Sequence, residues 1–204
     1  MTVETPARFS PLSGWQDRFA QLPTGLRVRE LPFLTQLTLR VEPGSAAAKA
    51  VEDCLGIILP GPLRAGSPGD VEVLWTGPDE WLLVAPDGRQ DDLLARLRSA
   101  IGDDFATVTD VSAQRTTLAL SGPLVRTVLA QGCALDLDPR VTPAGSCLTT
   151  LLAQAPVTLV VREEEPSGVR LLVRSSFASY LATWLLDACT EYRSDTGGRG
   201  WDGR

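Results

Sequence analysis

The chain has 204 residues, of which 44% are hydrophobic and 22% are charged, and its net charge is −6. This is the balance of a folded protein with room for one fair-sized domain or two small ones. Acidic and basic residues are mixed along the chain, so no basic stripe is available for nucleic-acid binding.

Histidine is absent from the sequence. The commonest general base and the commonest metal ligand are therefore missing, and so is every nucleophile system that depends on histidine. No apolar run reaches the roughly 18 residues of a membrane-spanning helix. Residues 1–10 also lack the apolar run of a secretory signal, so we expect a cytoplasmic protein.

The cysteines are widely spaced, and each lies within an apolar pattern: Cys54, Cys133, Cys147 and Cys189. We interpret them as buried reduced thiols, because free cysteine packs as a small hydrophobe and a cytosolic chain keeps it reduced. The sequence contains no Cys-x-x-Cys pair that would indicate zinc or redox chemistry.

In chain order, residues 1–24 form an expected N-terminal arm, in which Trp15, Phe19 and Leu22 have a helical spacing. Alternation and turn residues then predict a strand over 35–41, a helix over 46–55 with Ser45 as its N-cap, strands over 71–75 and 80–85, and a helix over 91–101 that stops at Gly102. These elements form the first expected lobe, at about 25–104.

The second expected lobe spans about 105–192. Its predicted elements are a strand over 116–120, a helix over 124–131, strands over 147–153, 157–161 and 169–174, and a helix over 177–189 capped by Ser176. Residues 193–204 are rich in glycine and polar residues, and we expect a disordered tail there.

The two halves of the chain resemble each other. Thr38-Leu39 through Cys54 to Pro60 aligns without a gap on Thr117-Leu118 through Cys133 to Pro139, and Leu82-Leu83-Val84 matches Leu171-Leu172-Val173. Each half reads strand, helix, strand, strand, helix. One such unit cannot bury both faces of its sheet alone, so the sequence predicts an α+β fold of two pseudo-repeated lobes packed together.

Residues that could perform chemistry are few. The carboxylate pairs Asp91/Asp92, Asp103/Asp104 and Asp136/Asp138 fit a helix N-terminus and two turns. No glycine-rich phosphate loop is present. Lys49 is the only lysine, and the other 18 positive charges are arginines, whose planar fork suits fixed pairing with carboxylates. The candidates for such pairing, at an interface or within the fold, are Arg115, Arg126, Arg162, Arg170 and Arg174.

Four blocks in this order resemble the gamma subunit family of heterotetrameric sarcosine oxidase: WTGPDEWLLV at 75–84, DVSAQRTTLALSGP at 110–123, VLAQGCALDLDP at 128–139 and VRSSFASYL at 173–181. The resemblance covers about residues 25–190. It implies a fold similar to the folate-binding domain of the glycine-cleavage aminomethyltransferase.

The resemblance also implies a function. The complex oxidises sarcosine to glycine, formaldehyde and hydrogen peroxide, and captures the formaldehyde as methylenetetrahydrofolate when tetrahydrofolate is present. FAD, FMN, NAD and the folate site are implied to lie on the large alpha and beta subunits, and zinc on the small delta subunit. No catalytic, cofactor or metal residue is therefore expected in this chain, which would serve as a non-catalytic assembly subunit.

Two positions depart from related patterns. Ala113 follows Ser112 where relatives often have histidine, and Gln131 precedes Gly132-Cys133 where iron–sulfur repair proteins of the same fold have lysine. The second departure disfavours that branch. The alternative function is a free-standing folate-binding or one-carbon-transfer protein, which would need further domains. For the partner interface the sequence points to Trp15, Phe19, Arg115, Arg126 and Arg174.

Overall fold

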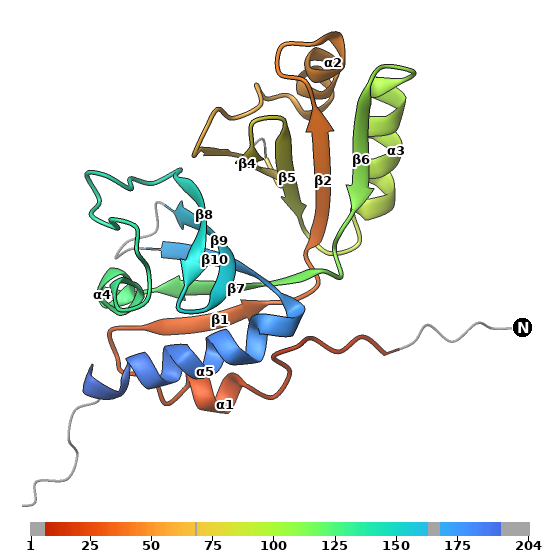
Figure 1. Ribbon diagram of the computed structural model, residues 1–204. Coiled ribbons are helices and arrows are strands. Elements are labelled where there is room, and N and C mark those ends of the chain that lie inside the picture. The colour runs from red at the N-terminus through yellow and green to blue at the C-terminus, as the bar shows by residue number, and fades with distance from the viewer. Residues whose placement is uncertain (1–6, 68, 163–167, 193–204) are drawn as a thin grey trace, which may run out of the picture.

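The computed structural model describes residues 7–67, 69–162 and 168–192, which form two antiparallel sheets of five strands each (Figure 1). In spatial order, one sheet contains β3 (Ala65–Gly66), β4 (Glu72–Gly77), β5 (Glu80–Ala85), β2 (Thr35–Val41) and β6 (Ala106–Asp110). The other contains β1 (Arg27–Leu31), β7 (Arg115–Ser121), β10 (Gly168–Arg174), β9 (Ala155–Arg162) and β8 (Cys147–Leu152).

Helices cover one face of each sheet. The first sheet packs against α2 (Ala46–Leu55) and α3 (Gln90–Ile101), and we call this unit the N-lobe. The second packs against α1 (Gln16–Phe19), α4 (Val125–Ala130) and α5 (Ala178–Ala188), and we call it the C-lobe. Short 3-10 turns, η1 (Ser175–Phe177) and η2 (Thr190–Tyr192), flank α5. Among the described residues, no helix has the length and apolar character needed to cross a membrane.

The predicted α+β fold of two pseudo-repeated lobes is confirmed. Read from the edge strand inward, β6-β2-β5-β4-β3 of the N-lobe corresponds to β1-β7-β10-β9-β8 of the C-lobe. In each lobe the second strand is followed by a helix, and the third strand is followed by another. Apart from the edge strands β6 and β1, the two lobes therefore build the same sheet in the same chain order.

The edge strands are exchanged between the lobes. β1 precedes β2 in sequence but pairs with β7, whereas β6 precedes β7 but pairs with β2. The boundary predicted near residue 104 follows sequence order and puts both strands in the wrong sheet. Neither strand was predicted. Each buries only one apolar side chain, Val28 in β1 and Val108 in β6, so the alternation of apolar and polar residues that indicates a strand is missing from the sequence.

The internal repeat is out of step by one residue in its second part. Leu39 and Leu118 are equivalent in the first part of the repeat, and their partners on the neighbouring strand are Trp81 and Leu171, which both pack against the helices of their own lobe. The alignment by letters instead matched Leu82 with Leu171. Successive strand residues face opposite sides, so this slip exchanges the two faces of the sheet.

Local signals account for both ends of α2. Ser45 accepts a hydrogen bond from the Ala48 N–H at 3.1 Å, which confirms the predicted N-cap. Gly56 ends α2 with a φ of 72°, a left-handed conformation open to glycine. The prediction that Ser176 caps the last helix is wrong, because Ser176 lies inside η1 and the N-cap position of α5 is Phe177, without a side-chain cap.

The lobes meet through the sheet faces that their helices leave open. A third apolar cluster joins Leu74, Leu82 and Val84 of the N-lobe to Cys147, Val160 and Leu172 of the C-lobe. Burial and then the charge of Glu72 raise the pKa of the Cys147 thiol to about 12. Backbone hydrogen bonds add to this contact, among them Cys147 N–H to the Leu63 carbonyl at 2.9 Å.

The beginning of β1 is fixed by a close backbone approach. Gly122 has a φ of 121°, and a Cβ atom there would lie 2.2 Å from the Gly25 carbonyl oxygen. That oxygen accepts a hydrogen bond from the Leu124 N–H at 3.0 Å. Glycine at 122 therefore lets the chain before β1 lie directly on the end of β7.

Candidate subunit interface

The described part of the N-terminal arm, residues 7–24, folds onto the C-lobe. Leu12 and Phe19 are 1% and 8% exposed and belong to the C-lobe core. Phe19, predicted as an interface residue, is therefore part of this chain's own core. Trp15 is half-buried beside it, with ring centroids 5.9 Å apart, and the Arg18 guanidinium lies 4.1 Å from the Trp15 ring centroid.

Two hollows flank the beginning of this arm. A cavity of about 650 Å³ lies between the arm and β1, with Phe19, Leu22 and Val28 in its wall. A second, of about 640 Å³, lies between the lobes, and its walls come from the arm, the loop before α3 and the β6–β7 turn. Arg8, Phe9, Ser10 and Phe33 line both hollows, so this stretch of the arm forms the partition between them.

Arg115 is one of the residues that line the cavity between the lobes. Its carbonyl oxygen accepts a hydrogen bond from Gln36 Nε2 at 3.3 Å, and the Gln36 N–H donates to Ser112 Oγ at 3.0 Å. Ser112 is itself fixed, because both its N–H, at 2.9 Å, and its Oγ, at 2.5 Å, donate to Asp110 Oδ1. The β6–β7 turn is thereby held against β2, and Arg115 begins β7 from a fixed position.

Arg174 lies directly across the ladder from Arg115 in the antiparallel pairing of β7 with β10. Residues opposite each other in such a ladder project from the same face. Burial, and after it the neighbouring charge of Arg174, lower the pKa of Arg115. The structure thus brings together Arg115 and Arg174, a second pair among the five predicted interface residues beside Trp15 and Phe19.

Arg126 is used inside the fold. Its Nη1 donates to the Leu137 carbonyl, and its Nη2 donates to the Thr142 carbonyl at 3.2 Å. These bonds hold the long segment between α4 and β8 against α4. Arg126 is half-buried and links these two carbonyl groups, whereas its Nε is buried without a hydrogen-bond partner among the described residues.

The other arginines expected to pair with carboxylates do so across the lobes. Glu72 at the start of β4 receives hydrogen bonds from Arg162 Nη1 and, at 3.1 Å, from Arg170 Nη1. The Glu72 side chain is 7% exposed, whereas those of Arg162 and Arg170 are 30% and 28% exposed. This cluster is a fixed ionic link between the N-lobe and the C-lobe, and no local sequence pattern marks Glu72 as a buried residue.

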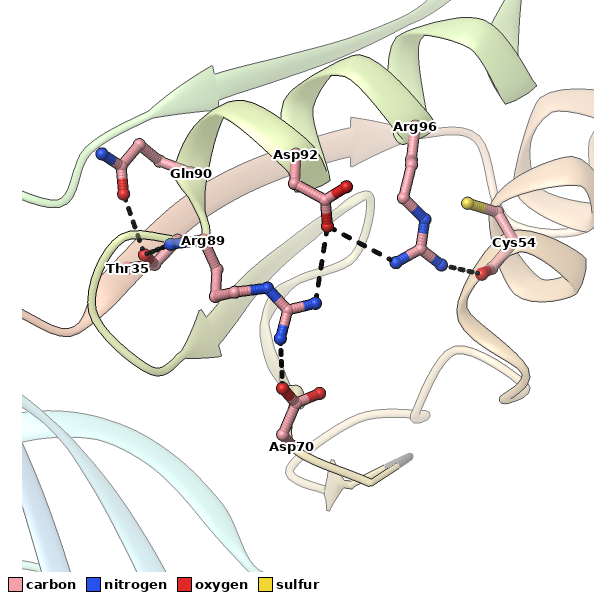
Figure 2. Close-up of polar contacts among 7 residues, drawn as sticks. All are labelled: Thr35, Cys54, Asp70, Arg89, Gln90, Asp92 and Arg96. Atoms are coloured by element: carbon pink, nitrogen blue, oxygen red, sulfur yellow. Dashed lines mark hydrogen bonds and ion pairs between the residues drawn. The ribbon is translucent and has the colours of Figure 1, made fainter.

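A second arginine network ties α3 to its surroundings (Figure 2). Figure 2 shows Arg89 between Asp70 and Asp92, with Asp92 3.4 Å away, and Arg96 reaching Asp92 at 3.8 Å. Arg96 also donates to the Cys54 carbonyl at the end of α2, at 3.0 Å. Arginine therefore joins α3 to α2 and to the loop before β4.

Thr35 completes this network at the start of α3 (Figure 2). Its Oγ1 donates to Gln90 Oε1 at 3.2 Å and accepts from the Arg89 N–H at 3.0 Å. The bond to the Arg89 N–H satisfies a donor at the helix N-terminus, because Arg89 itself provides no side-chain cap. A strand residue distant in sequence thus performs the capping.

The predicted carboxylate turn at Asp136 and Asp138 is present. The Asp138 N–H donates to Asp136 Oδ1, and Arg140 donates to Asp138 from its N–H and its guanidinium, each at 2.9 Å. The guanidinium of Arg140, and after it the Arg140 N–H, lower the pKa of Asp138. Over the described ranges, no group of three or more Cys, Asp or Glu residues is placed to hold a metal ion.

Comparison with known proteins identifies the family. Residues 41–191 match the sequence profile of the "Sarcosine oxidase, gamma subunit family". Sarcosine oxidase subunit gamma of Corynebacterium sp. (strain P-1) is 40% identical over 195 residues, which is 94% of each chain. The corresponding subunit of Arthrobacter sp. is 39% identical over 196 residues, covering 94% of this chain and 95% of the relative.

Solved structures agree with this assignment. A chain of heterotetrameric sarcosine oxidase from Corynebacterium sp. U-96, in complex with pyrrole 2-carboxylate, superposes with a TM-score of 0.83 at 37% identity, covering 91% of this chain and 96% of that one. The glycine cleavage system aminomethyltransferase T of Bartonella henselae gives a TM-score of 0.63 at 17% identity, covering 86% of this chain and 49% of that one, and shows a shared fold alone. The chain belongs to the sarcosine oxidase gamma subunit family.

Proposed function

We propose that this chain works as a non-catalytic assembly subunit of a heterotetrameric sarcosine oxidase, bound to alpha, beta and delta subunits. The observation that supports this most strongly is the end-to-end match to a chain of heterotetrameric sarcosine oxidase. Among the described residues, Arg96, Arg162 and Arg170 serve as structural links within the chain, through the contacts of Glu72 and of α3.

The complex would oxidatively demethylate sarcosine to glycine, releasing hydrogen peroxide and either formaldehyde or methylenetetrahydrofolate. In this proposal FAD, FMN and NAD, together with the site for tetrahydrofolate, lie on the large subunits, and zinc lies on the delta subunit. We place the complex in the cytoplasm, which suits the free thiols of Cys54, Cys133 and Cys147.

Surface chemistry supports a role in protein contacts. Several large apolar side chains are exposed, namely Phe105 at 100%, Phe9 at 82%, Ile58 at 80% and Val141 at 62%. Phe9 also borders the cavity between the lobes, next to the half-buried Arg115. An aromatic ring beside an arginine is a typical composition for the centre of a protein interface. Trp15 and Arg174 remain proposed contact residues, close to the same arm and the same strand end.

Co-expression with the genes for the three expected partners tests the proposal. Recovery of a stable yellow complex containing this chain and three other polypeptides is the expected result. A monomer that purifies alone and binds folate would favour the free-standing alternative and refute the assembly role.

Omission of the chain tests whether its role is structural. We expect a lower yield or stability of the large subunits, with an unchanged flavin spectrum in whatever assembles, because no flavin would depend on this chain. Normal assembly combined with the selective loss of one chemical step would contradict the proposal.

A further inference from the structure

The cavity between the lobes contains an arginine side chain whose charge is not balanced within the described chain. Arg115 is half-buried, and its Nη1 is fully buried without a hydrogen-bond acceptor among the described residues. A buried donor on a charged group costs free energy when it has no partner, so native structures rarely leave one open. Because Nη1 is itself closed to solvent, an acceptor from outside the described residues can reach Arg115 only through the other nitrogens of the guanidinium group, which also have no hydrogen bond or ion pair among the described residues.

Arg174 adds a second positive charge next to Arg115, outside the residues that line the cavity itself. It is exposed and faces Arg115 directly across the ladder. In the parts of the chain that the structure describes, neither arginine has a carboxylate within ion-pair distance. Glu80 is the weakest of the three influences on the pKa of Arg115, and it is itself paired with Arg40 at 3.9 Å. Like charges directly opposite each other in a sheet repel, and an anion bound between them would remove this repulsion.

The carboxylates around the cavity are already engaged. Asp110 accepts from Ser112, and Asp87 pairs with Arg8 at 2.9 Å. Glu30, beside the cavity, accepts from Ser10 Oγ at 2.6 Å and from Thr116 Oγ1 at 2.7 Å. None of these three carboxylates is paired with Arg115, although the whole sequence has a net charge of −6.

The rim of the cavity is aromatic. Phe9 is 82% exposed, and the Phe33 ring lies 4.2 Å from the Arg8 guanidinium carbon. A small dissolved anion would leave Phe9 in water. An acidic side chain carried on a protein surface would meet the arginines and cover the ring together.

We propose that Arg115 and Arg174 bind a carboxylate of an acidic side chain that a partner subunit inserts into the cavity between the lobes. The guanidinium fork matches a carboxylate through two parallel hydrogen bonds, and these bonds are strong in a site shielded from water. This inference rests on the proposed assembly role and names one of its contacts.

The test measures how fast the labelled chain dissociates from the purified four-subunit complex when unlabelled chain is in excess. Three variants are compared with the wild type: Arg115→Gln, Arg174→Gln and, as a charge-matched control, Arg98→Gln. Arg98 is an exposed residue of α3 without an ion pair among the described residues.

Removing one partner of a buried charge pair acts on the dissociation rate, so Arg115→Gln is expected to raise that rate about 30-fold or more. Arg174→Gln, at an exposed position, is expected to raise it by up to about fivefold. Both effects should shrink at high salt. Arg98→Gln should dissociate at the wild-type rate.

A folded Arg115→Gln chain that dissociates at the wild-type rate overturns the inference. If that variant does not fold, Arg174→Gln decides, and a wild-type rate for it overturns the inference equally. A third outcome would also refute the inference: the isolated chain binds acetate at micromolar concentration, and both variants dissociate from the complex at the wild-type rate. The site would then bind a free carboxylate. A wild-type chain that never assembles would instead refute the proposed function itself.

Discussion

The ionic link between the lobes gives the sharpest prediction about stability. Glu72 is 7% exposed and is shared by Arg162 and Arg170, which belong to the other lobe. Glu72→Gln keeps the shape of the side chain but leaves both guanidinium groups without their counter-charge. Breaking a fully buried pair costs about 3–5 kcal/mol.

The two arginine side chains are 30% and 28% exposed, so water can solvate their charges and offset part of this loss. We therefore expect a loss of about 2–3 kcal/mol in the free energy of unfolding. For a chain of this size, that loss lowers Tm by about 4–12 °C.

Urea and thermal unfolding of the isolated chain, followed by circular dichroism and tryptophan fluorescence, measure the effect. The matched control is Arg40→Gln, which removes an exposed pair with Asp79 and should cost less than about 1 kcal/mol. If Glu72→Gln lost no more stability than Arg40→Gln, the cluster would not link the lobes and the reasoning would be refuted.

Other changes test local features of the fold. Ser45→Ala should lower the free energy of unfolding by about 1 kcal/mol, measured in urea, because the Ala48 N–H loses its acceptor; an unchanged midpoint would contradict this. Gly122→Ala should lower the free energy of unfolding by at least about 2 kcal/mol, because the new Cβ would collide with the Gly25 carbonyl. A Tm equal to that of the wild type would show that the backbone moves to accommodate the Cβ at little cost. The raised pKa of Cys147 stabilises the fold below about pH 9, and this contribution is lost as pH rises toward about 12. The free energy of unfolding, measured from pH 8 to 11, should therefore decline in the wild type and decline less in Cys147→Ala. Equal slopes of this free energy against pH in the two proteins would exclude the thiol as the cause.

The repeated architecture could be predicted from the sequence because it depends on local patterns. Alternation in β2 and β7, the Ser45 cap and the apolar stripe of α3 each act within a few residues. The blocks around 110–123 and 173–181 also indicated the family by their residues alone. Those blocks cover the β6–β7 turn with β7, and the junction of β10 with α5.

The partners of the edge strands could only be decided in three dimensions. β1 and β6 each carry a single buried residue, so hydrogen bonding to a strand distant in sequence fixes their place. For the same reason, the one-residue slip between Leu82 and Leu171 was invisible to an alignment by letters.

The roles of individual arginines also came from the tertiary structure. In the sequence they are equivalent candidates, since each arginine has the same charge and the same donors. Folding placed Arg162 and Arg170 on Glu72, and Arg126 on two carbonyl groups. It left Arg115 with a buried nitrogen that has no acceptor in the described chain, opposite Arg174. Composition thus determined that this chain would depend on arginine pairing, whereas burial and strand register, which join distant residues, decided which arginines are satisfied within the fold.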